Sequence, residues 1–429
     1  MSSVCVHGLG YIGLPTAAML ANYDHDVYGY DIDPAITSNL RDGEASFDEP
    51  GLRAFVTQAL ESGQLEIVDD VVSANYHVIC VPTPFDDVEK AADLSYVEAA
   101  ADAVVPVLRK RDTIILESTV PPGTTSTNVR GILEKSGLVA GEDFALVYCP
   151  ETVLPGDIVS ELRTNDRIVG GVNGISTESA VRLYESFVDG EIHTTSDPTT
   201  AEFVKLVQNT FRDVNIALAN EIAKLAAEYD IDSREAIAMA NAHPRVDILE
   251  PGPGVGGHCL PVDPWFLGET SQELELIATA RAVNDGMTGY VIDLLSEELG
   301  TLAERRIAIL GAAYKGNVGD TRNSPGLRMA RELQHGLERS VPAVDGGRID
   351  APEVVVHDPH VVDPTLDLHD LESATTDTDA LVIATDHDEF ESLDPEPLGD
   401  RMARRTVIDT KAMLDTERWR RAGFTVRRV

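Results

Sequence analysis

The sequence predicts an α/β fold with two Rossmann-like, doubly wound domains joined by a central region that contains one long helix. Over residues 1–195, short apolar runs alternate with helical stretches, and the same alternation returns over residues 301–429. Continuously apolar runs with helices between them are typical of strands buried in a parallel sheet. Residues 196–300 have a helical pattern, so we expect three domains with these boundaries.

The strands follow in order along the two outer blocks. In the first block we expect them at residues 4–6, 77–81, 113–116 and 145–148. In the third block we expect them at residues 307–311, 354–356, 380–383 and 406–408. Each run is short and mostly aliphatic, as buried strands are.

The central block predicts a helix that begins at Asp197-Pro198 and ends near Asp230. Its apolar residues recur at spacings of three and four: Phe203, Val207, Phe211, Val214, Leu218, Ile222 and Leu225. A helix of about 28 residues is about 40 Å long, more than a single domain usually needs. Such a helix joins domains or packs against its copy, so we expect a homodimer or a higher homo-oligomer.

The charge of the chain excludes several classes of partner. The 429 residues carry 34 Lys+Arg against 73 Asp+Glu, a formal net charge of −39. Such a surface repels phosphate backbones and anionic lipids, so we expect no nucleic-acid or membrane partner. No apolar run approaches the ~18 residues of a membrane span and no signal peptide is seen, which predicts a cytoplasmic protein.

The choice of basic residues indicates a protein that works in concentrated salt. Lysine occurs only at positions 90, 110, 135, 205, 224, 315 and 411, and the other basic residues are arginine. At about 1 M salt the Debye length is about 3 Å, so the self-repulsion of the acidic surface is screened. We therefore expect a halophilic protein.

A glycine motif follows the first expected strand. Gly8, Gly10 and Gly13, with Tyr11 and Ile12 between the last two, form GxGxxG at the start of a helical pattern. These glycines permit a tight turn, close approach to a pyrophosphate and close helix–strand packing. Asp31 ends the next strand, where a carboxylate binds the adenosine ribose and repels a 2′-phosphate, which predicts NAD. The alternative is a glycine turn without a ligand.

A second glycine-rich segment precedes a cysteine. Gly252, Gly254, Gly256 and Gly257 lead to Cys259, so the backbone can approach a ligand and present amide donors. A cysteine in such a turn is a candidate nucleophile, and the alternative is a structural thiol. Asp263 follows as a candidate water-orienting base.

The long helix carries a third candidate pair. Lys205 and Asn209 are four residues apart, so they share a face that lies opposite the apolar stripe. A cation and an amide there could stabilise negative charge on a substrate oxygen. The alternative is a solvated helix face.

These motifs together resemble those of the UDP-glucose/GDP-mannose dehydrogenase family over essentially the whole chain. The resemblance is strongest to the branch that acts on UDP-N-acetyl-D-mannosamine. The stretches that carry it are 148–156, 165–167, 211–217, 243–246 and 251–266.

The resemblance implies roles for individual residues. Cys259 is implied as the covalent nucleophile, and the groups implied to handle protons, the oxyanion and water are Lys205, Asn209, Asp263 and Thr119. Glu151 is implied as a second acid–base group in the sugar pocket. Thr83 and Thr119 are implied to contact the cofactor.

The resemblance also implies substrate contacts. Lys205, Asn209, Glu151 and the glycines 252, 254 and 256 are implied in the sugar site. Lys315 is implied to bind the nucleotide sugar, Arg322 to approach NAD, and Arg245 to reach substrate across a dimer interface. The branch usually has Arg after the Pro-Glu pair, where this chain has Thr152, which leaves the hexose open.

The implied reaction is a four-electron oxidation at C6 of a UDP-N-acetylhexosamine to the uronate, with two NAD and a thiohemiacetal and thioester on Cys259. UDP-N-acetyl-D-mannosamine is the preferred substrate, with UDP-N-acetylglucosamine and UDP-glucose as alternatives. A β-hydroxyacid dehydrogenase also pairs a Rossmann domain with Lys-x-x-x-Asn, but it needs neither the cysteine turn nor a third block. A non-catalytic nucleotide-sugar binding protein is the alternative from another class.

No metal is expected. The four cysteines lack CxxC spacing, and Cys5, Cys80 and Cys149 fall in or beside strands as small buried residues. The residues His357, His360, His369 and 386–388 are expected to be solvated loop residues.

Overall fold

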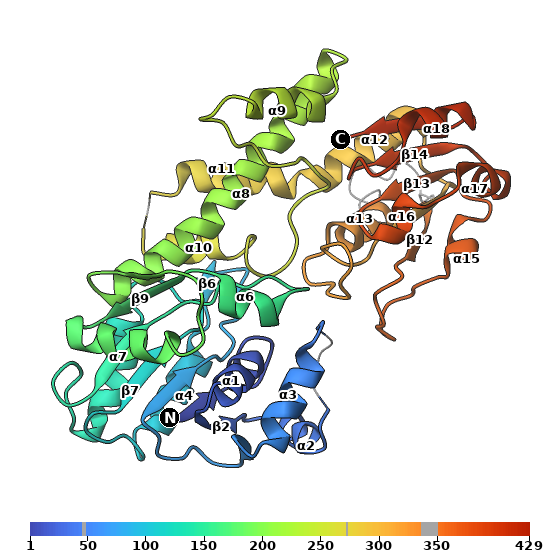
Figure 1. Cartoon of the computed structure of the whole chain (residues 1–429). Helices are drawn as coiled ribbons and strands as arrows, with labels where there is room; N and C mark the ends of the chain where they lie inside the picture. The colour runs from blue at the N-terminus through green and yellow to red at the C-terminus, as the bar shows by residue number, and fades with distance from the viewer. Residues whose placement is uncertain (45–48, 272, 336–350) are drawn as a thin grey trace, which may run out of the picture. The chain divides into compact units, whose positions relative to one another are not determined.

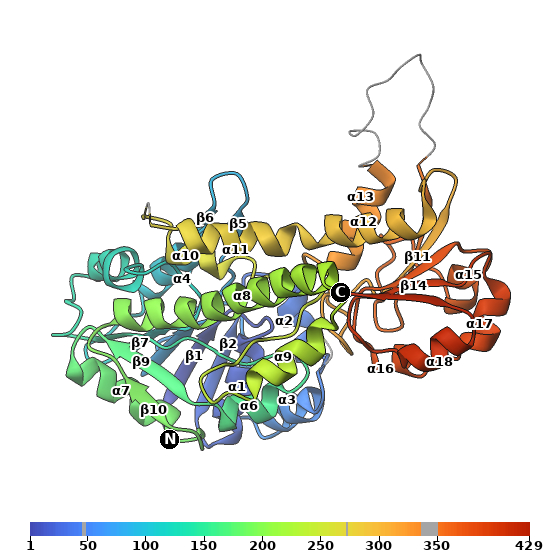
Figure 2. The same ribbon diagram turned by 90° about the horizontal axis from the view of Figure 1, so that it is seen from above.

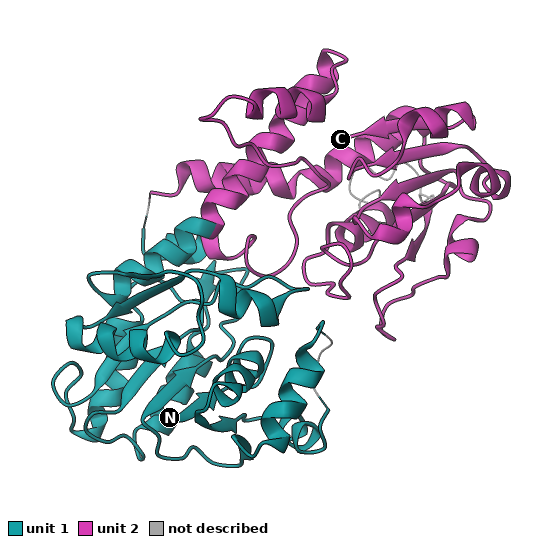
Figure 3. Cartoon of the chain, in the orientation of Figure 1, with its two compact units in different colours: residues 1–208, 265–272 teal, residues 209–264, 273–429 magenta. Residues whose placement is uncertain are grey.

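A nearly all-parallel sheet forms the core of the N-terminal part of the computed structural model (Figure 1). The structure describes residues 1–44, 49–271, 273–335 and 351–429. The chain divides into two compact units, and Figure 3 colours them separately. Unit 1 comprises residues 1–208 and 265–272, and unit 2 comprises residues 209–264 and 273–429.

The described part of unit 1 contains an eight-stranded sheet in the order β10-β9-β8-β7-β4-β1-β2-β3. Every neighbouring pair is parallel except β8 with β9. The strands are β1 (Ser3–His7), β2 (Asp26–Tyr30), β3 (Leu65–Val68), β4 (Tyr76–Ile79), β7 (Thr113–Leu116), β8 (Ala145–Tyr148), β9 (Arg167–Gly171) and β10 (Ile192–Thr194). The strand order reverses between β1 and β4, the point at which doubly wound sheets bind their ligands.

Helices cover both faces of this sheet. They are α1 (Gly13–Asn22), α2 (Pro34–Arg41), α3 (Leu52–Glu61), α4 (Ser95–Val104), α5 (Arg130–Leu133), α6 (Ile158–Thr164) and α7 (Gly174–Tyr184). Apolar residues of α1, α3 and α6 form one core cluster with β1 and β4, and residues of α4 form another with β7 and β8. A short hairpin of β5 (Phe85–Asp86) and β6 (Ala91–Ala92) follows β4.

The predicted long helix is α8 (Pro198–Glu228), whose 31 residues correspond to about 46 Å (Figure 2). Its apolar stripe is largely exposed: Phe203, Val207, Phe211, Leu218 and Leu225. The buried face is the polar one, with Glu202, Lys205, Asn209, Asp213 and Asn220. The alternative that Lys205 and Asn209 lie on a solvated face is therefore wrong, since each is 8% exposed.

Unit 2 contains an all-parallel sheet in the order β12-β11-β13-β14-β15. Its strands are β11 (Arg306–Leu310), β12 (Glu353–His357), β13 (Ala380–Ile383), β14 (Thr406–Asp409) and β15 (Thr425–Arg428). Its order reverses between β11 and β13. The second Rossmann-like domain is thus confirmed.

The helices that the structure describes in the rest of the chain are α9 (Ser233–Asn241), α10 (Asp263–Leu267), α11 (Glu275–Asp285), α12 (Met287–Leu299), α13 (Pro325–His335), α15 (Leu371–Thr375), α16 (Asp388–Glu391), α17 (Pro395–Arg401) and α18 (Thr416–Arg421). Unit 2 also repeats the helix–strand contact of unit 1. A Cβ on Gly13 would lie 1.9 Å from Gly8 O, and a Cβ on Gly326 would lie 2.2 Å from Gly311 O. In the part of the chain that the structure describes, no helix combines the length and apolar character that a bilayer crossing requires.

Candidate active site

The turn between β1 and α1 fits a dinucleotide. Gly8 has φ +87°, and a Cβ there would lie 2.8 Å from Cys80 O. Gly13 lets α1 cross β1 closely, whereas a Cβ on Gly10 would meet nothing within 4 Å. Gly8 and Gly13 are thus required by the fold. The open space at Gly10, just before the start of α1, is where a pyrophosphate would approach the backbone.

Asp31, at the end of β2, is oriented by backbone amides. Its Oδ2 accepts from Leu9 N at 2.7 Å and its Oδ1 from Asp33 N at 2.9 Å. One carboxylate is therefore tied to the glycine turn, and each oxygen keeps a lone pair for a ribose hydroxyl. These contacts suit NAD, which would supply a hydride acceptor at the C-terminal edge of the sheet.

Two loops at the switch point of unit 1 are tied together. Thr83 Oγ1 donates to Thr119 O at 2.8 Å, and Ser118 Oγ donates to Val81 O at 2.7 Å. The loops after β4 and β7 therefore hold each other beside the glycine turn. The structure brings Thr83 and Thr119 together, as the cofactor assignment of these two residues requires.

Glu49 was not found from the sequence. It is buried, and it accepts hydrogen bonds from the Tyr11 hydroxyl and from Gly156 N, at 3.1 and 3.0 Å from its two oxygens. It therefore ties the glycine motif to the loop that follows Glu151. A lone Glu in a polar stretch gives no sequence signal for this role.

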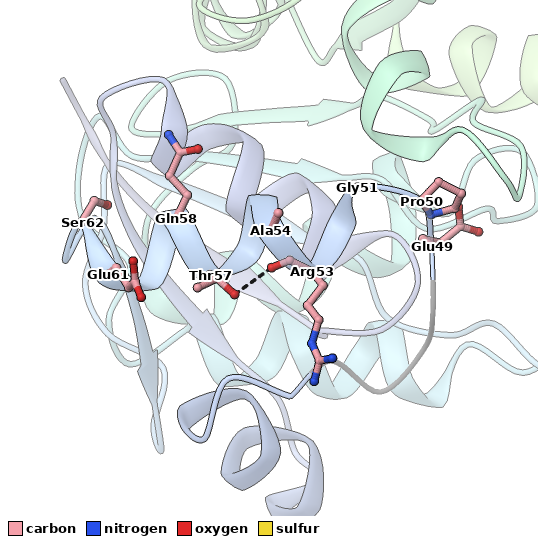
Figure 4. Close-up of a pocket in the computed structure, with 9 residues that line it drawn as sticks. All are labelled: Glu49, Pro50, Gly51, Arg53, Ala54, Thr57, Gln58, Glu61 and Ser62. Atoms are coloured by element: carbon pink, nitrogen blue, oxygen red, sulfur yellow. Dashed lines mark hydrogen bonds between the residues drawn. The ribbon is translucent and has the colours of Figure 1, made fainter.

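Glu49 also borders a hollow of about 930 Å³ on unit 1 (Figure 4). The hollow is lined by residues of α3 and of the turn before it: Glu49, Pro50, Gly51, Arg53, Ala54, Thr57, Gln58, Glu61 and Ser62. None of the predicted site residues lies among them. We assign it no function.

Glu151 is buried in an ion pair. Its Oε2 lies 2.7 Å from Arg167 Nη1, and its Oε1 accepts from Thr152 N at 2.7 Å. Arg167 Nη1 is also 4.0 Å from Glu117 Oε1, which accepts from the Tyr184 hydroxyl at 2.6 Å. Two buried carboxylates thus share one guanidinium, and burial raises the pKa of Glu117. The acid–base role of Glu151 remains a prediction. The ion pair with Arg167 holds the Glu151 carboxylate in place.

Burial leaves three of the four cysteines protonated at neutral pH. It raises the pKa of Cys5 to about 11 and of Cys149 to about 12, and it raises that of Cys80, with a smaller contribution from Glu117. Cys259 is the exposed cysteine. Because the thiolate is the nucleophile, the surroundings of the other three argue against them.

In unit 2, Cys259 stands one turn before Asp263. Val262 N and Asp263 N donate to Cys259 O at 3.0 and 2.8 Å, and Asn209 Nδ2 donates to Asp263 Oδ2 at 2.6 Å. Three predicted residues from two distant segments are thus brought together. His258, which sequence reasoning gave no role, places Nδ1 3.7 Å from Cys259 Sγ, within range of a thiol hydrogen bond.

The glycines before Cys259 meet protein atoms. A Cβ on Gly256 would lie 2.6 Å from Tyr314 Cβ, and one on Gly257 would lie 3.0 Å from Tyr314 Cε2. A Cβ on Gly254 would lie 3.2 Å from Asn284 O, whereas Gly252 has open space around it. Close packing within unit 2 therefore accounts for Gly256 and Gly257, whereas the sequence interpretation invoked a ligand.

A buried polar network supports this loop. Asn220 Oδ1 accepts from Gly252 N at 2.8 Å, and Asn220 Nδ2 donates to Asn284 Oδ1 at 2.9 Å. Asn284 in turn donates to Asp213, which pairs with Arg281 at 2.6 Å. The signal that sequence reasoning missed is a second stripe on α8, polar and at helical spacing.

The remaining predicted basic residues lie in different places. Lys205 belongs to unit 1, and Arg245 is exposed in the turn after α9. Arg322 pairs with Asp320 at 2.5 Å. The hydrogen bond to Asp320 is the main cause of the raised pKa of Arg322, with a smaller contribution from Cys259. Lys315 lies in the loop after β11.

Two groups of described side chains have metal-binding residue types: Cys5, His7 and His77, and His360, His387 and Glu389. His7 Nδ1 and His77 Nε2 have no hydrogen-bond partner, whereas metal-bound imidazoles normally use their second nitrogen. Both ring nitrogens of His387 are already hydrogen bonded, and its ring is buried. The interpretation of His387 as a solvated residue is therefore wrong. The expectation that the protein binds no metal stays a prediction.

Known proteins match the chain throughout. Three models of the UDP-glucose/GDP-mannose dehydrogenase family match it: the NAD binding domain over residues 2–188, the central domain over 199–286 and the UDP binding domain over 308–416. A UDP-N-acetyl-D-mannosamine dehydrogenase of Methanococcus vannielii is 42% identical over 435 residues, covering 100% of this chain and 96% of that protein.

Two further relatives are similar to this chain over nearly its whole length. The solved structure of UDP-D-ManNAc dehydrogenase from Pyrococcus horikoshii has a TM-score of 0.90 at 41% identity, and 100% of this chain and 99% of that chain are covered. An NDP-N-acetyl-D-galactosaminuronic acid dehydrogenase of Ralstonia nicotianae is 40% identical over 429 residues, or 97% of each protein. The resemblance found from the motifs is confirmed: this chain belongs to the UDP-glucose/GDP-mannose dehydrogenase family of NAD-dependent nucleotide-sugar dehydrogenases.

Proposed function

We propose that this protein oxidises C6 of UDP-N-acetyl-D-mannosamine to the uronate. The observation that carries the reaction is the arrangement in unit 2, where the one exposed cysteine among the described residues is followed by Asp263, itself held by Asn209. The substrate rests on the relatives at 41–42% identity whose names specify that sugar nucleotide.

In the proposed mechanism, NAD supplies the hydride acceptor for both oxidations when it is bound. The first oxidation removes a hydride from C6 and a proton from its hydroxyl, which leaves an aldehyde. Cys259 Sγ then adds to the aldehyde carbon and gives a thiohemiacetal. Loss of a second hydride and the hydroxyl proton leaves a thioester, and water releases the carboxylate and restores the thiol.

The side chains divide this work. Asp263 orients or deprotonates the water, and Asn209 fixes the carboxylate by its hydrogen bond. Lys205 and Thr119 stabilise the developing oxyanion and handle the hydroxyl proton, and Glu151 acts as a second acid–base group. Gly252, Lys315 and Arg245 are proposed to bind the sugar nucleotide, with Arg245 acting from a neighbouring subunit.

The hexose is tested by comparing substrates. In high-salt buffer, UDP-N-acetylmannosamine, UDP-N-acetylglucosamine, UDP-N-acetylgalactosamine and UDP-glucose are each supplied with NAD, and NADH is followed by absorbance. Two NADH per UDP-N-acetylmannosamine, with product uronate by mass spectrometry, is the expected result. Preference for another hexose would overturn the substrate and keep the reaction, and no turnover with retained NAD binding would favour a non-catalytic binding protein.

The proposal includes a homodimer in a salt-rich cytoplasm. The exposed apolar stripe of α8, with Phe203, Phe211 and Leu218, supports self-association, because exposed patches of this kind mark interfaces. Light scattering should give a dimer, and Phe211→Glu should give a monomer.

The proposed halophilic character is tested by the salt dependence of the activity. Activity that is lost at low salt would support it, and full activity at low salt would oppose it. The three family models support the proposed domain boundaries near residues 195 and 300.

A further inference from the structure

Asp358, which follows β12, gathers five hydrogen bonds on one buried carboxylate. Its Oδ2 accepts from Ala312 N at 2.7 Å, Ala313 N at 2.8 Å and His387 Nε2 at 2.9 Å. Its Oδ1 accepts from His360 N and Val361 N at 2.8 and 3.0 Å. Burial alone would raise the pKa of Asp358, but these hydrogen bonds, led by that from His387, lower it to about 2.

His387 joins Asp358 to a third loop. Its Nδ1 accepts from Asn317 N at 2.9 Å, so its proton is on Nε2, which donates to Asp358. The ring is fully buried, stacked on His360 at 4.7 Å between centroids and edge-on to Phe390 at 5.3 Å. The ring therefore has one orientation.

The segment held by this pair is the loop after β11. Its backbone is fixed at Ala312 and Ala313 by Asp358 and at Asn317 by His387, and Thr385 Oγ1 donates to Ala313 O at 2.6 Å. Tyr314 lies between these anchors, and Tyr314 N donates to Asp320 O at 2.9 Å. The position of Tyr314 is thus set from both sides.

Tyr314 in turn meets the cysteine loop. A Cβ on Gly256 would lie 2.6 Å from Tyr314 Cβ, and Gly257 combines φ +81° with a distance of 3.0 Å from its Cβ position to Tyr314 Cε2. Both positions therefore favour glycine. Gly257 N donates to Arg322 O at 2.8 Å, and Asn323 Nδ2 donates to Gly257 O at 2.8 Å. Cys259 is two residues further along the chain.

We propose that Asp358 and His387 are positioning residues for Cys259, acting through the loop that carries Tyr314. The proposal rests on the proposed function, in which Cys259 is the nucleophile. If the pair is broken, the loop moves, and Tyr314 no longer fixes Gly256 and Gly257. Cys259 then loses its set place relative to His258 and Arg322. A cation beside a thiol favours the thiolate, so a displacement of this loop relative to Arg322 is expected to make Cys259 less reactive.

Two variants each break one half of the link. His387→Gln keeps a donor toward Asp358 and loses the acceptor for Asn317 N, whereas His387→Asn keeps the acceptor and loses the donor. His360→Gln is the matched control, since His360 stacks on the same ring and its Nε2 pairs with the exposed Glu389 rather than with Asp358 or Asn317. Circular dichroism establishes that each variant is folded.

The first readout is alkylation of Cys259 by iodoacetamide across pH, without substrate or cofactor. Both His387 variants are expected to move the midpoint of this profile upward, and His360→Gln to leave it in place. In turnover, kcat is expected to fall about tenfold or more while KM for NAD stays unchanged, because small misplacements of a reacting group lower the rate strongly.

An unchanged alkylation profile in folded His387 variants would overturn the positioning role whatever the value of kcat. A shifted profile in a protein that turns over no sugar nucleotide would support the positioning role and overturn the proposed function. The two failures are therefore separable.

Discussion

Asn209 on α8 donates a 2.6 Å hydrogen bond to Asp263, which is 54 residues away in sequence, and both side chains are buried. Asp263 also closes the turn after Cys259 through its own N–H. One amide therefore orients a carboxylate one turn from the proposed nucleophile.

Removing this amide should impair the reaction. In Asn209→Ala, Asp263 loses a hydrogen-bond donor while buried, so we expect kcat to fall about 10- to 100-fold and stability by about 1–3 kcal/mol. Steady-state NADH formation and urea unfolding measure the two effects. Gln208→Ala, on the exposed side of the same helix, is the control and should change neither. A wild-type kcat in Asn209→Ala would contradict the role of the pair.

Cysteine reactivity should separate Cys259 from the other three cysteines. Because burial raises the pKa of Cys5, Cys80 and Cys149, native protein treated with iodoacetamide should carry one alkyl group, on Cys259. Peptide mass spectrometry identifies the site. Unfolded protein is the control, in which all four should react.

The variant Cys259→Ser should form a first intermediate in turnover and release no uronate. Release of uronate at the wild-type rate would refute the assignment of Cys259 as the nucleophile.

Asp31 should set the choice of cofactor. Asp31→Asn removes the charge that a ribose diol binds and a 2′-phosphate avoids, so KM for NAD should rise about tenfold and KM for NADP should fall. Asp33→Asn is the control, because Asp33 caps α2 through Ala35 N. An unchanged ratio of the two KM values in Asp31→Asn would rule out this role.

Arg167 should be essential for stability. Arg167→Met leaves Glu151 and Glu117 buried without their cation, and breaking such pairs destabilises by about 3–5 kcal/mol. Urea unfolding measures the loss. Arg163→Met removes an exposed pair with Asp189 and should lower stability by less than about 1 kcal/mol. A similar loss of unfolding free energy in the two variants would show that the buried ion pairs of Arg167 stabilise the fold no more than an exposed pair does.

Two buried histidines should make the fold sensitive to acid. Burial, with a smaller contribution from His77, lowers the pKa of His7 to about 3, and burial with a smaller contribution from Arg109 lowers that of His77 to about 4. The unfolded chain therefore binds protons first as the pH falls below about 6.5, and stability is lost progressively down to about pH 4 for His77 and about pH 3 for His7.

The double variant His7→Ile, His77→Val should flatten this part of the stability profile. Urea unfolding at several pH values between 4 and 7 measures the slope, and His193→Gln, at an exposed position, is the control. The hypothesis fails if the double variant keeps the wild-type slope.

The sequence by itself predicted β1, β2, β4, β7 and β8 of the first sheet and β11, β12, β13 and β14 of the second, because a strand buried on both faces is apolar throughout. It did not predict β3, β9, β10 or β15, nor the antiparallel pairing of β8 with β9. It also determined the glycine turn, since Gly8 and Gly13 meet backbone atoms that any Cβ would overlap. The start of α8 at Pro198 follows from a local signal of the same kind.

Tertiary structure alone decided which face of α8 is buried. Within one chain the apolar stripe is exposed at Phe211, and the polar face is buried at Asp213, whose Oδ1 accepts hydrogen bonds from Arg281 and Asn284. Partners of that kind come from distant segments, and a single sequence does not show them. The same reason hid Glu49, the cation shared by Glu151 and Glu117, and the burial of His387, whose hydrogen-bond partners Asp358 and Asn317 reach it from two other loops.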